Sequence, residues 1–138
     1  MQAFFVVAVV FTLVATSSAE TTEGFQKTIR PIAEHCKETV KGTDEDVETA
    51  VHLKRDVTPV GKCLMACVME AIGMMRNGTM ASEEEILKPY RAVFADDPRR
   101  LSKGEEVVKN CRVEALQKFP TQTCDMAHLA VFCTLANT

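Results

Sequence analysis

Six cysteines constrain the fold of this 138-residue chain more than any other feature of its sequence. They are Cys36, Cys63, Cys67, Cys111, Cys124 and Cys133. The chain has no Cys-x2-Cys pair and its three histidines are scattered, so the spacing does not fit a zinc site. In an exported chain of this size, six cysteines normally form three disulfides. We therefore expect three cross-links, no metal and no cofactor.

Residues 1–19 have the pattern of a secretory signal peptide. An apolar run from Phe4 to Val14 is followed by the small residues Ser17-Ser18-Ala19, although no Lys or Arg precedes the run. The run is too short to remain as a membrane anchor. We expect cleavage after Ala19, which leaves a single secreted, extracellular domain over residues 20–138. A membrane-anchored chain is the alternative.

The net charge of the chain argues against several kinds of partner. It is −3, and cleavage leaves it unchanged because residues 1–19 carry no charged side chain. An acidic chain without a basic run is poorly suited to bind nucleic acid or an anionic membrane. No later segment is long enough to cross a bilayer, so stable membrane insertion is not expected.

Helical periodicity and turn signals divide the mature chain into about six helices, and no segment alternates as a strand would. The expected helices cover about 25–40, 43–53, 58–77, 82–94, 97–119 and 122–136. Gly42 is expected to stop the first, and Asn77-Gly78 to close the third. Thr43 with Asp46 resembles a capping box, and Pro59 and Pro98 occupy positions that favour helix starts. The sequence therefore predicts an all-α fold.

Two of the expected helices are apolar in almost every direction. Residues 62–75 carry only Lys62 and Glu70 as charges, and residues 124–136 carry only Asp125. A helix that is hydrophobic all round must be surrounded by other elements. We therefore expect these two helices to lie at the centre, with amphipathic helices packed around them.

Helix geometry limits the disulfide pairing without deciding it. Cys124 and Cys133 are nine residues apart, so they point to opposite faces of one helix and cannot bond each other. Cys63 and Cys67 share a face, but a bridge between them would close a very small loop and gain little. Excluding both local pairs leaves roughly ten of the fifteen possible pairings.

The complete spacing is Cys36-x26-Cys63-x3-Cys67-x43-Cys111-x12-Cys124-x8-Cys133. Behind a signal peptide, it resembles the six-cysteine signature of insect odorant-binding proteins over the whole mature chain. The x3 and x8 gaps match that family, and the other gaps lie within or slightly beyond its usual range. The resemblance implies a compact six-helix bundle held by three disulfides around an internal hydrophobic cavity. It also implies the pairs Cys36–Cys67, Cys63–Cys124 and Cys111–Cys133, each worth ~2–4 kcal/mol.

Methionines give the first candidate cavity wall. Met65, Val68, Met69 and Ile72 share the side of the 62–75 helix that faces away from Cys63 and Cys67. Flexible thioether side chains can adapt to ligands of several shapes. The alternative is that these methionines fill an irregular core, which periodicity alone would favour. The family resemblance favours the cavity for the set as a whole.

The remaining candidate ligand-binding residues lie on the later helices. They are Leu87, Tyr90, Phe94, Phe119, His128, Phe132 and Leu135. His128 is interpreted as a hydrogen-bond donor or proton switch, against the alternative of a satisfied core histidine. Tyr90 is a second candidate polar group. Only five residues follow Cys133, too few for the long tail of some moth relatives, so Leu135 and the terminal carboxylate are expected to close the cavity.

The resemblance implies a carrier of small hydrophobic molecules, namely odorants or pheromones in sensillar lymph. An olfactory receptor is then a candidate partner, and the carrier is expected to be a monomer or weak homodimer. A non-olfactory carrier or scavenger is the main alternative. A membrane-active defence protein is less favoured because such activity usually needs a cationic surface.

No catalytic motif is present, so we expect no enzyme activity. Asn77-Gly78-Thr79 is a glycosylation sequon that equally serves as a turn.

Overall fold

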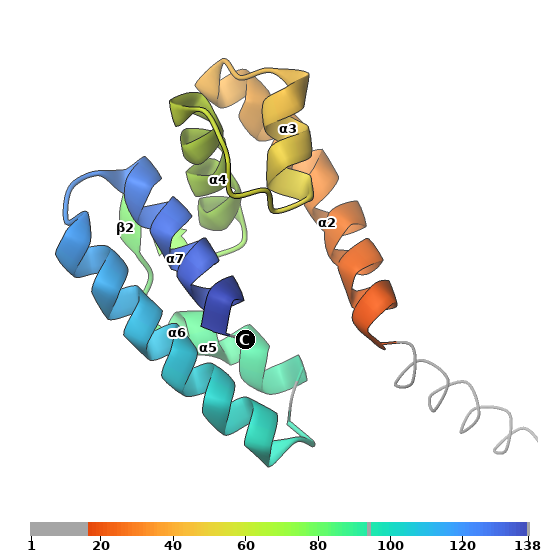
Figure 1. Cartoon of the computed structure of the whole chain (residues 1–138), viewed down its shortest axis with the longest axis vertical. Helices are drawn as coiled ribbons and strands as arrows, with labels where there is room; N and C mark the ends of the chain where they lie inside the picture. The colour runs from red at the N-terminus through yellow and green to blue at the C-terminus, as the bar shows by residue number, and fades with distance from the viewer. Residues whose placement is uncertain (1–16, 94, 138) are drawn as a thin grey trace, which may run out of the picture.

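The computed structural model describes residues 17–93 and 95–137, and these form a helical bundle (Figure 1). The six described helices are α2 (Ser17–Val40), α3 (Asp44–Val51), α4 (Pro59–Ala71), α5 (Glu83–Val93), α6 (Pro98–Lys118) and α7 (Thr123–Asn137). A short hairpin, β1 (Met75–Arg76) and β2 (Thr79–Met80), joins α4 to α5. The predicted all-α bundle is thus confirmed. Most of the expected signal peptide, residues 1–16, lies outside the described residues, and cleavage after Ala19 stays a prediction.

Three helices begin at the caps that the sequence indicates. The Thr43 hydroxyl accepts a hydrogen bond from the Asp46 N–H at 3.2 Å, and the Asp46 carboxylate accepts one from the Thr43 N–H at 2.9 Å, so the capping box is present. The Thr58 hydroxyl caps α4 by accepting a hydrogen bond from the Gly61 N–H at 2.9 Å, with Pro59 as the first helical residue. Asp97 caps α6 before Pro98. These starts follow from local chemistry, because each cap satisfies backbone N–H groups that the helix itself leaves free.

The third helix ends earlier than predicted, at Ala71 rather than near Asn77. Gly73 adopts a φ of 85°, the left-handed conformation that ends many helices. The N–H of Met74 bonds to the carbonyl of Met69 at 2.9 Å, and the N–H of Gly73 bonds to that of Glu70 at 3.1 Å. These two bonds form a Schellman motif, in which the glycine reverses the chain. The predicted end near Asn77 is therefore wrong because Gly73 already stops the helix.

The early end of α4 releases a segment that forms a hairpin, so the expectation of no strand is wrong at this point. Met75 pairs with Met80 and Arg76 with Thr79 across the turn Asn77-Gly78. Both turn residues have positive φ, 53° for Asn77 and 79° for Gly78, as a type I′ hairpin turn requires. Asn-Gly is the sequence that favours this turn most strongly. The sequon residue Asn77 is exposed on it.

The end of α2 also departs from the expectation that Gly42 stops it. The left-handed residue is Lys41, with a φ of 58°, and the N–H of Gly42 bonds back to the carbonyl of Lys37 at 2.9 Å. Gly42 is needed instead for space, because a Cβ at this position would lie 3.2 Å from the carboxylate of Asp46. The glycine therefore allows the α2–α3 turn to approach the capping box of α3.

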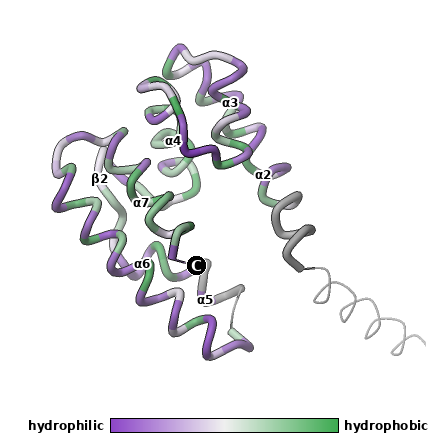
Figure 2. Tube along the Cα trace, viewed as in Figure 1, coloured by the Kyte–Doolittle hydropathy of each residue, from purple (hydrophilic) through white to green (hydrophobic). Residues whose placement is uncertain are grey.

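Helix α4 lies between two buried clusters of side chains. Its residues Leu64 and Val68 pack with α2 and α3, whereas Met65 and Met69 pack with the hairpin and with α5, α6 and α7. Helix α7 packs against both α4 and α6 (Figure 1). In Figure 2, α7 is coloured mainly as hydrophobic, while α6 alternates between hydrophilic and hydrophobic residues. The central position predicted for these two apolar helices is confirmed.

Three disulfides connect the helices. Cys36–Cys67 joins α2 to α4, Cys63–Cys124 joins α4 to α7, and Cys111–Cys133 joins α6 to α7. The Cα atoms are 5.8, 4.5 and 5.6 Å apart in these pairs. They are the pairs that the family resemblance implies. No cysteine of the described chain is free.

Helix α3 carries no cysteine and is joined to the start of α4 through Asp46. This side chain is 5% exposed. One carboxylate oxygen accepts from the Thr43 N–H at 2.9 Å and the other accepts from the Thr58 hydroxyl at 2.9 Å, so one residue connects the N-caps of two helices. Burial opposes ionisation of Asp46, but the hydrogen bonds from Thr43 and Thr58 outweigh it and lower the pKa of the carboxyl.

Loop length predicts an order for the effects of removing disulfides. Cys63 and Cys124 are 61 residues apart and Cys111 and Cys133 are 22 apart, so the first bridge restricts the unfolded chain more. Replacing both cysteines of a pair with serine should cost about 4 kcal/mol of unfolding free energy for Cys63–Cys124 and about 3 kcal/mol for Cys111–Cys133. Urea unfolding of both double variants measures the two costs. The reverse order would contradict this account.

The lowered pKa of Asp46 predicts an acid-dependent stability. A carboxyl with a depressed pKa stabilises the fold above its ordinary pKa of ~3.9, and this contribution is lost as the pH falls through the folded-state value. Asp46→Asn should lower the unfolding free energy at pH 7 by roughly 1–2 kcal/mol, the worth of hydrogen bonds to a charged group. The difference from wild type should shrink below about pH 4. Asp44→Asn, at an exposed position of the same helix, serves as the control for urea unfolding.

Candidate functional site

An apolar cavity of about 180 Å³ lies beside α4. Each of the six described helices contributes to its wall, and the hairpin segment contributes as well. The wall therefore exists only when the whole bundle is assembled.

Helix α4 supplies a continuous face of this wall. Met65, Val68, Met69 and Ile72 all line the cavity. Their spacing places them on one side of the helix, while Cys63 and Cys67 turn to the neighbours with which they form disulfides. These four residues are the ones that the sequence places together, and their role in holding a ligand is a proposal taken up below.

The side of the cavity formed by α2 and α3 was not predicted from sequence. Phe25 and Ile29 come from α2, and Ala50 and Leu53 come from α3 and the residues just after it. Phe25 and Ile29 are four residues apart and therefore share one face of α2. Leu53 has a φ of 51°, which is costly for a branched side chain. The Lys54 N–H, bonded to the Thr49 carbonyl at 2.9 Å, holds this turn in place.

The opposite side is built by the later elements. Met74 and Met80 flank the hairpin turn, and Ile86 follows on α5. Helix α6 contributes Val108, Cys111 and Arg112 to the wall, and helix α7 contributes Ala130, Val131, Thr134 and Leu135. Among these later residues only Leu135 was a candidate from sequence. The sequence does not predict that Met74 and Met80 line the cavity. The hairpin positions these two residues, whereas the sequence predicts a helix that continues to residue 77.

The methionines divide between the two interpretations offered by the sequence. Four of them line the cavity, namely Met65, Met69, Met74 and Met80. Met75 and Met126 are 1% and 0% exposed and pack within the core cluster around α4 and α7. Methionines therefore line the cavity at four positions and pack in the core at two others.

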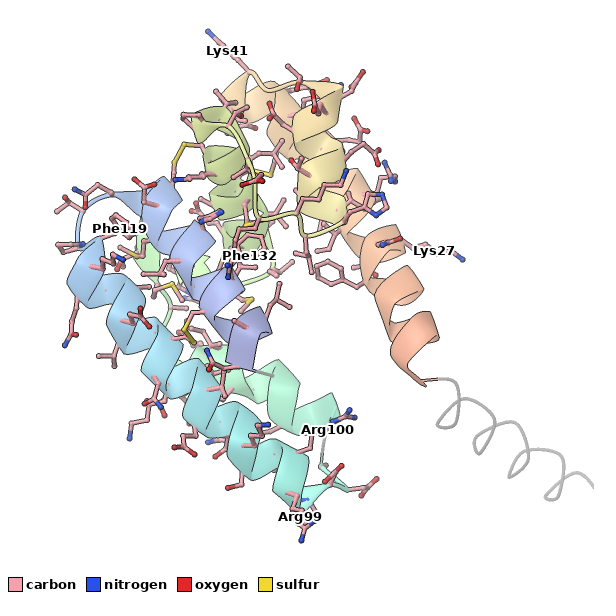
Figure 3. The ribbon with its side chains drawn as sticks, viewed as in Figure 1. Lys27, Lys41, Arg99, Arg100, Phe119 and Phe132 are labelled. Carbon is pink, nitrogen blue, oxygen red and sulfur yellow. A yellow bond between two sulfur atoms is a disulfide. The ribbon has the colours of Figure 1, made fainter. Side chains whose placement is uncertain are left out.

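The rim of the cavity is apolar and reaches the surface. Phe25, Ile72 and Leu135 line the cavity and are 36%, 40% and 44% exposed. They come from α2, from the end of α4 and from the end of α7. The charged residues labelled Lys27, Lys41 and Arg99 in Figure 3 point away from the bundle into solvent. The cavity therefore reaches the surface between three apolar side chains.

Three of the predicted ligand-binding residues, Phe119, Phe132 and Leu87, are absent from the described wall. Phe119 caps the end of α6 and packs against the core, and Figure 3 shows it apart from Phe132 on α7. Phe132 is 7% exposed and belongs to the core cluster. Leu87 is buried at 1% exposure in α5 and also lies off the described wall. A buried side chain in a small bundle can pack in the core or line the cavity. Sequence periodicity predicts burial but does not distinguish these two positions.

His128 does not face the cavity but holds the segment between α3 and α4 against α7. Its Nε2–H donates to the carbonyl of Arg55 at 3.0 Å, because a carbonyl can only accept. Its ring lies 4.7 Å from that of Phe132, and the Arg55 guanidinium lies 5.7 Å from the centre of the Phe132 ring. These contacts support the interpretation of His128 as a satisfied structural histidine.

Two further candidates cannot be placed on the wall or away from it. Phe94 and the side chain of Tyr90 lie outside the described residues.

Other kinds of site have little support in the described part of the chain. No group of three or more His, Cys, Asp or Glu residues there is arranged to hold a metal ion. None of the described helices has the length and apolar character needed to cross a bilayer.

A helical bundle cross-linked by three disulfides around an apolar cavity is the architecture of an odorant-binding protein. The PBP/GOBP family model matches residues 18–137, so the chain belongs to this family, and the resemblance of its cysteine spacing is confirmed. The family consists of binding proteins.

Two curated relatives come from Drosophila melanogaster. General odorant-binding protein 28a is 34% identical over 104 residues, which cover 73% of this chain and 68% of the relative. General odorant-binding protein 19d is 30% identical over 96 residues, which cover 70% of this chain and 62%, slightly less than two thirds, of the relative.

Solved structures share the fold. A pheromone-binding protein from the cockroach Leucophaea maderae, in complex with the fluorescent reporter ANS, matches with a TM-score of 0.68 at 15% identity, over 84% of this chain and 97% of that one. The Drosophila odorant-binding protein 28a matches with a TM-score of 0.66 at 26% identity, over 84% of this chain and 93% of that one.

The contacts of His128 predict a structural phenotype for its removal. His128→Ala loses one hydrogen bond and the ring packing on Phe132, and should lower the unfolding free energy by ~1–2 kcal/mol. Affinity for a fluorescent hydrophobic probe should stay the same, because the ring lies off the described wall. His35→Ala, at an exposed position of α2, is the control. Weaker probe binding with unchanged stability would instead place His128 in contact with the ligand.

Proposed function

We propose that this protein is a carrier that takes up one small hydrophobic molecule, an odorant or pheromone, in the cavity beside α4. The observation that carries this proposal is the apolar cavity of about 180 Å³ with its exposed apolar rim. An engineered apolar cavity of ~150 Å³ stays dry and binds benzene, so a cavity of this size suits a volatile molecule. Binding of ANS by the cockroach protein supports the idea that this fold admits an aromatic guest.

The expected affinity suits reversible transport. A ligand that buries ~300 Å² of apolar surface gains about 7 kcal/mol at ~25 cal/mol/Å². The loss of translational freedom and the ordering of flexible wall residues subtract from this gain. The net corresponds to roughly micromolar dissociation constants, at which uptake and release both occur readily.

Secretion and delivery are the finer parts of the proposal. Three disulfides suit an oxidising, extracellular compartment, in agreement with the expected signal peptide. Delivery through lymph to an olfactory receptor follows from the family relationship. The carrier is proposed to act as a monomer or weak homodimer, and a non-olfactory role as a carrier of hydrophobic molecules rests on the same cavity.

Filling the cavity should abolish binding. Val68 is 6% exposed and lines the cavity, so Val68→Phe places a phenyl group in the space for the ligand. Affinity for the fluorescent probe naphthalene should fall by at least about tenfold, equal to ~1.4 kcal/mol. Fluorescence titration measures the affinity, and circular dichroism verifies that the variant folds.

The matched control makes the same substitution on the surface. Val113 lies on α6, is 42% exposed and is absent from the described wall. Val113→Phe should leave probe affinity at the wild-type level. Equal affinity of wild type and Val68→Phe would mean that the probe binds elsewhere, and the proposed site would be wrong.

A further inference from the structure

The described cavity wall is mainly apolar. Its two polar residues are Arg112 and Thr134, and one hydrogen-bond donor of each is bonded to a backbone carbonyl. The Nε–H of Arg112 donates to Ala81 at 2.9 Å, and the Thr134 hydroxyl donates to Ala130 at 2.8 Å. The other described wall residues are apolar or disulfide-bonded. A polar group of a ligand would leave its water partners on entry and find only these two polar side chains on the described wall.

Sulfur is the second distinctive property of this wall. Met65 and Met69 come from α4, and Met74 and Met80 come from the two ends of the hairpin segment. Thioether sulfur is polarizable and makes favourable contacts with the edges of aromatic rings at ~5 Å. Phe25, at the rim, is the aromatic residue on the described wall. An aromatic ligand would therefore meet mainly methionine and aliphatic groups inside.

From these two properties we propose that the cavity selects uncharged aromatic compounds of one or two rings that carry no hydroxyl, amine or carboxyl group. This inference rests on the proposed carrier function and names its ligand class. The volume of about 180 Å³ sets the size limit. The scarcity of polar groups on the described wall disfavours polar substituents, and the four methionines favour a ring over a saturated ligand of the same skeleton.

The first test compares ligands that share one skeleton. The affinities of naphthalene, 2-naphthol and 2-naphthoate for the wild-type protein are measured by isothermal titration calorimetry. Naphthalene should bind at least about tenfold more tightly than either polar derivative, because the polar group of each derivative is buried against a mainly apolar wall. Binding of 2-naphthol or 2-naphthoate as tight as that of naphthalene overturns the proposal.

Tyr90 needs its own comparison because its side chain lies outside the described residues. In Tyr90→Phe, the order and the ratio of the three affinities should match those of wild type. If 2-naphthol binds tightly to wild type and loses that affinity in Tyr90→Phe, then Tyr90 is a polar anchor and the proposal is wrong.

The second test isolates the contribution of sulfur. The ratio of the affinity for naphthalene to that for its saturated counterpart decalin is measured in Met69→Leu and Met80→Leu. It should fall by about threefold relative to wild type, because leucine keeps the apolar volume but lacks the thioether. Met75→Leu and Met126→Leu are the matched controls, since both residues are buried in the core and lie off the described wall. Met75 pairs with Met80 across the hairpin, so Met75→Leu is the best-matched control for Met80→Leu.

The outcomes separate this inference from the carrier function beneath it. A ratio that is unchanged in the wall variants, or that falls equally in the core variants, overturns the role of the methionines while the protein still binds ligands. If none of the three naphthalene compounds binds to the wild-type protein, the carrier function fails and the ligand class fails with it.

Discussion

Three disulfides join four helices in series, and the remaining structure depends on this connection. Cys36–Cys67 links α2 to α4, Cys63–Cys124 links α4 to α7, and Cys111–Cys133 links α7 to α6. A bundle of this size buries too little apolar surface to tolerate much empty space without help. By restricting the unfolded chain, the cross-links stabilise a fold whose centre is left partly open. The cavity is thus possible because covalent bonds replace part of a solid core.

Helix α4 shows how one element can serve the core and the cavity together. Leu64 and Val68 pack toward α2 and α3, Met65 and Met69 pack toward α7, and Cys63 and Cys67 hold both sides in place. The cavity lies along the seam between these two clusters, where neither fills the space completely. Methionine suits such a seam because its unbranched side chain can occupy different rotamers with little strain.

Polar contacts hold the two helices that carry no cysteine. Asp46 connects the cap of α3 to the cap of α4, and Arg91 of α5 pairs with Glu105 of α6 at 2.8 Å. The contact of Arg91 is partly exposed and contributes modestly, whereas Asp46 is buried and its hydrogen bonds are charge-assisted. Helix α3 is therefore positioned by a buried polar group, and through Ala50 and Leu53 it closes one side of the cavity.

The sequence by itself determined the helical class, the helix starts at Thr43, Thr58 and Asp97, and the apolar faces of α4 and α7, because caps and periodicity are local properties of the chain. It also placed Met65, Val68, Met69 and Ile72 on one face. Only the tertiary structure decided which buried side chains border empty space. His128 and Phe132 resemble cavity residues in sequence, yet they pack on Arg55, whereas Phe25, Leu53 and Met80 reach the wall through the crossing of distant helices and a hairpin. A side chain becomes wall or core according to what lies opposite it, and that neighbour comes from elsewhere in the chain.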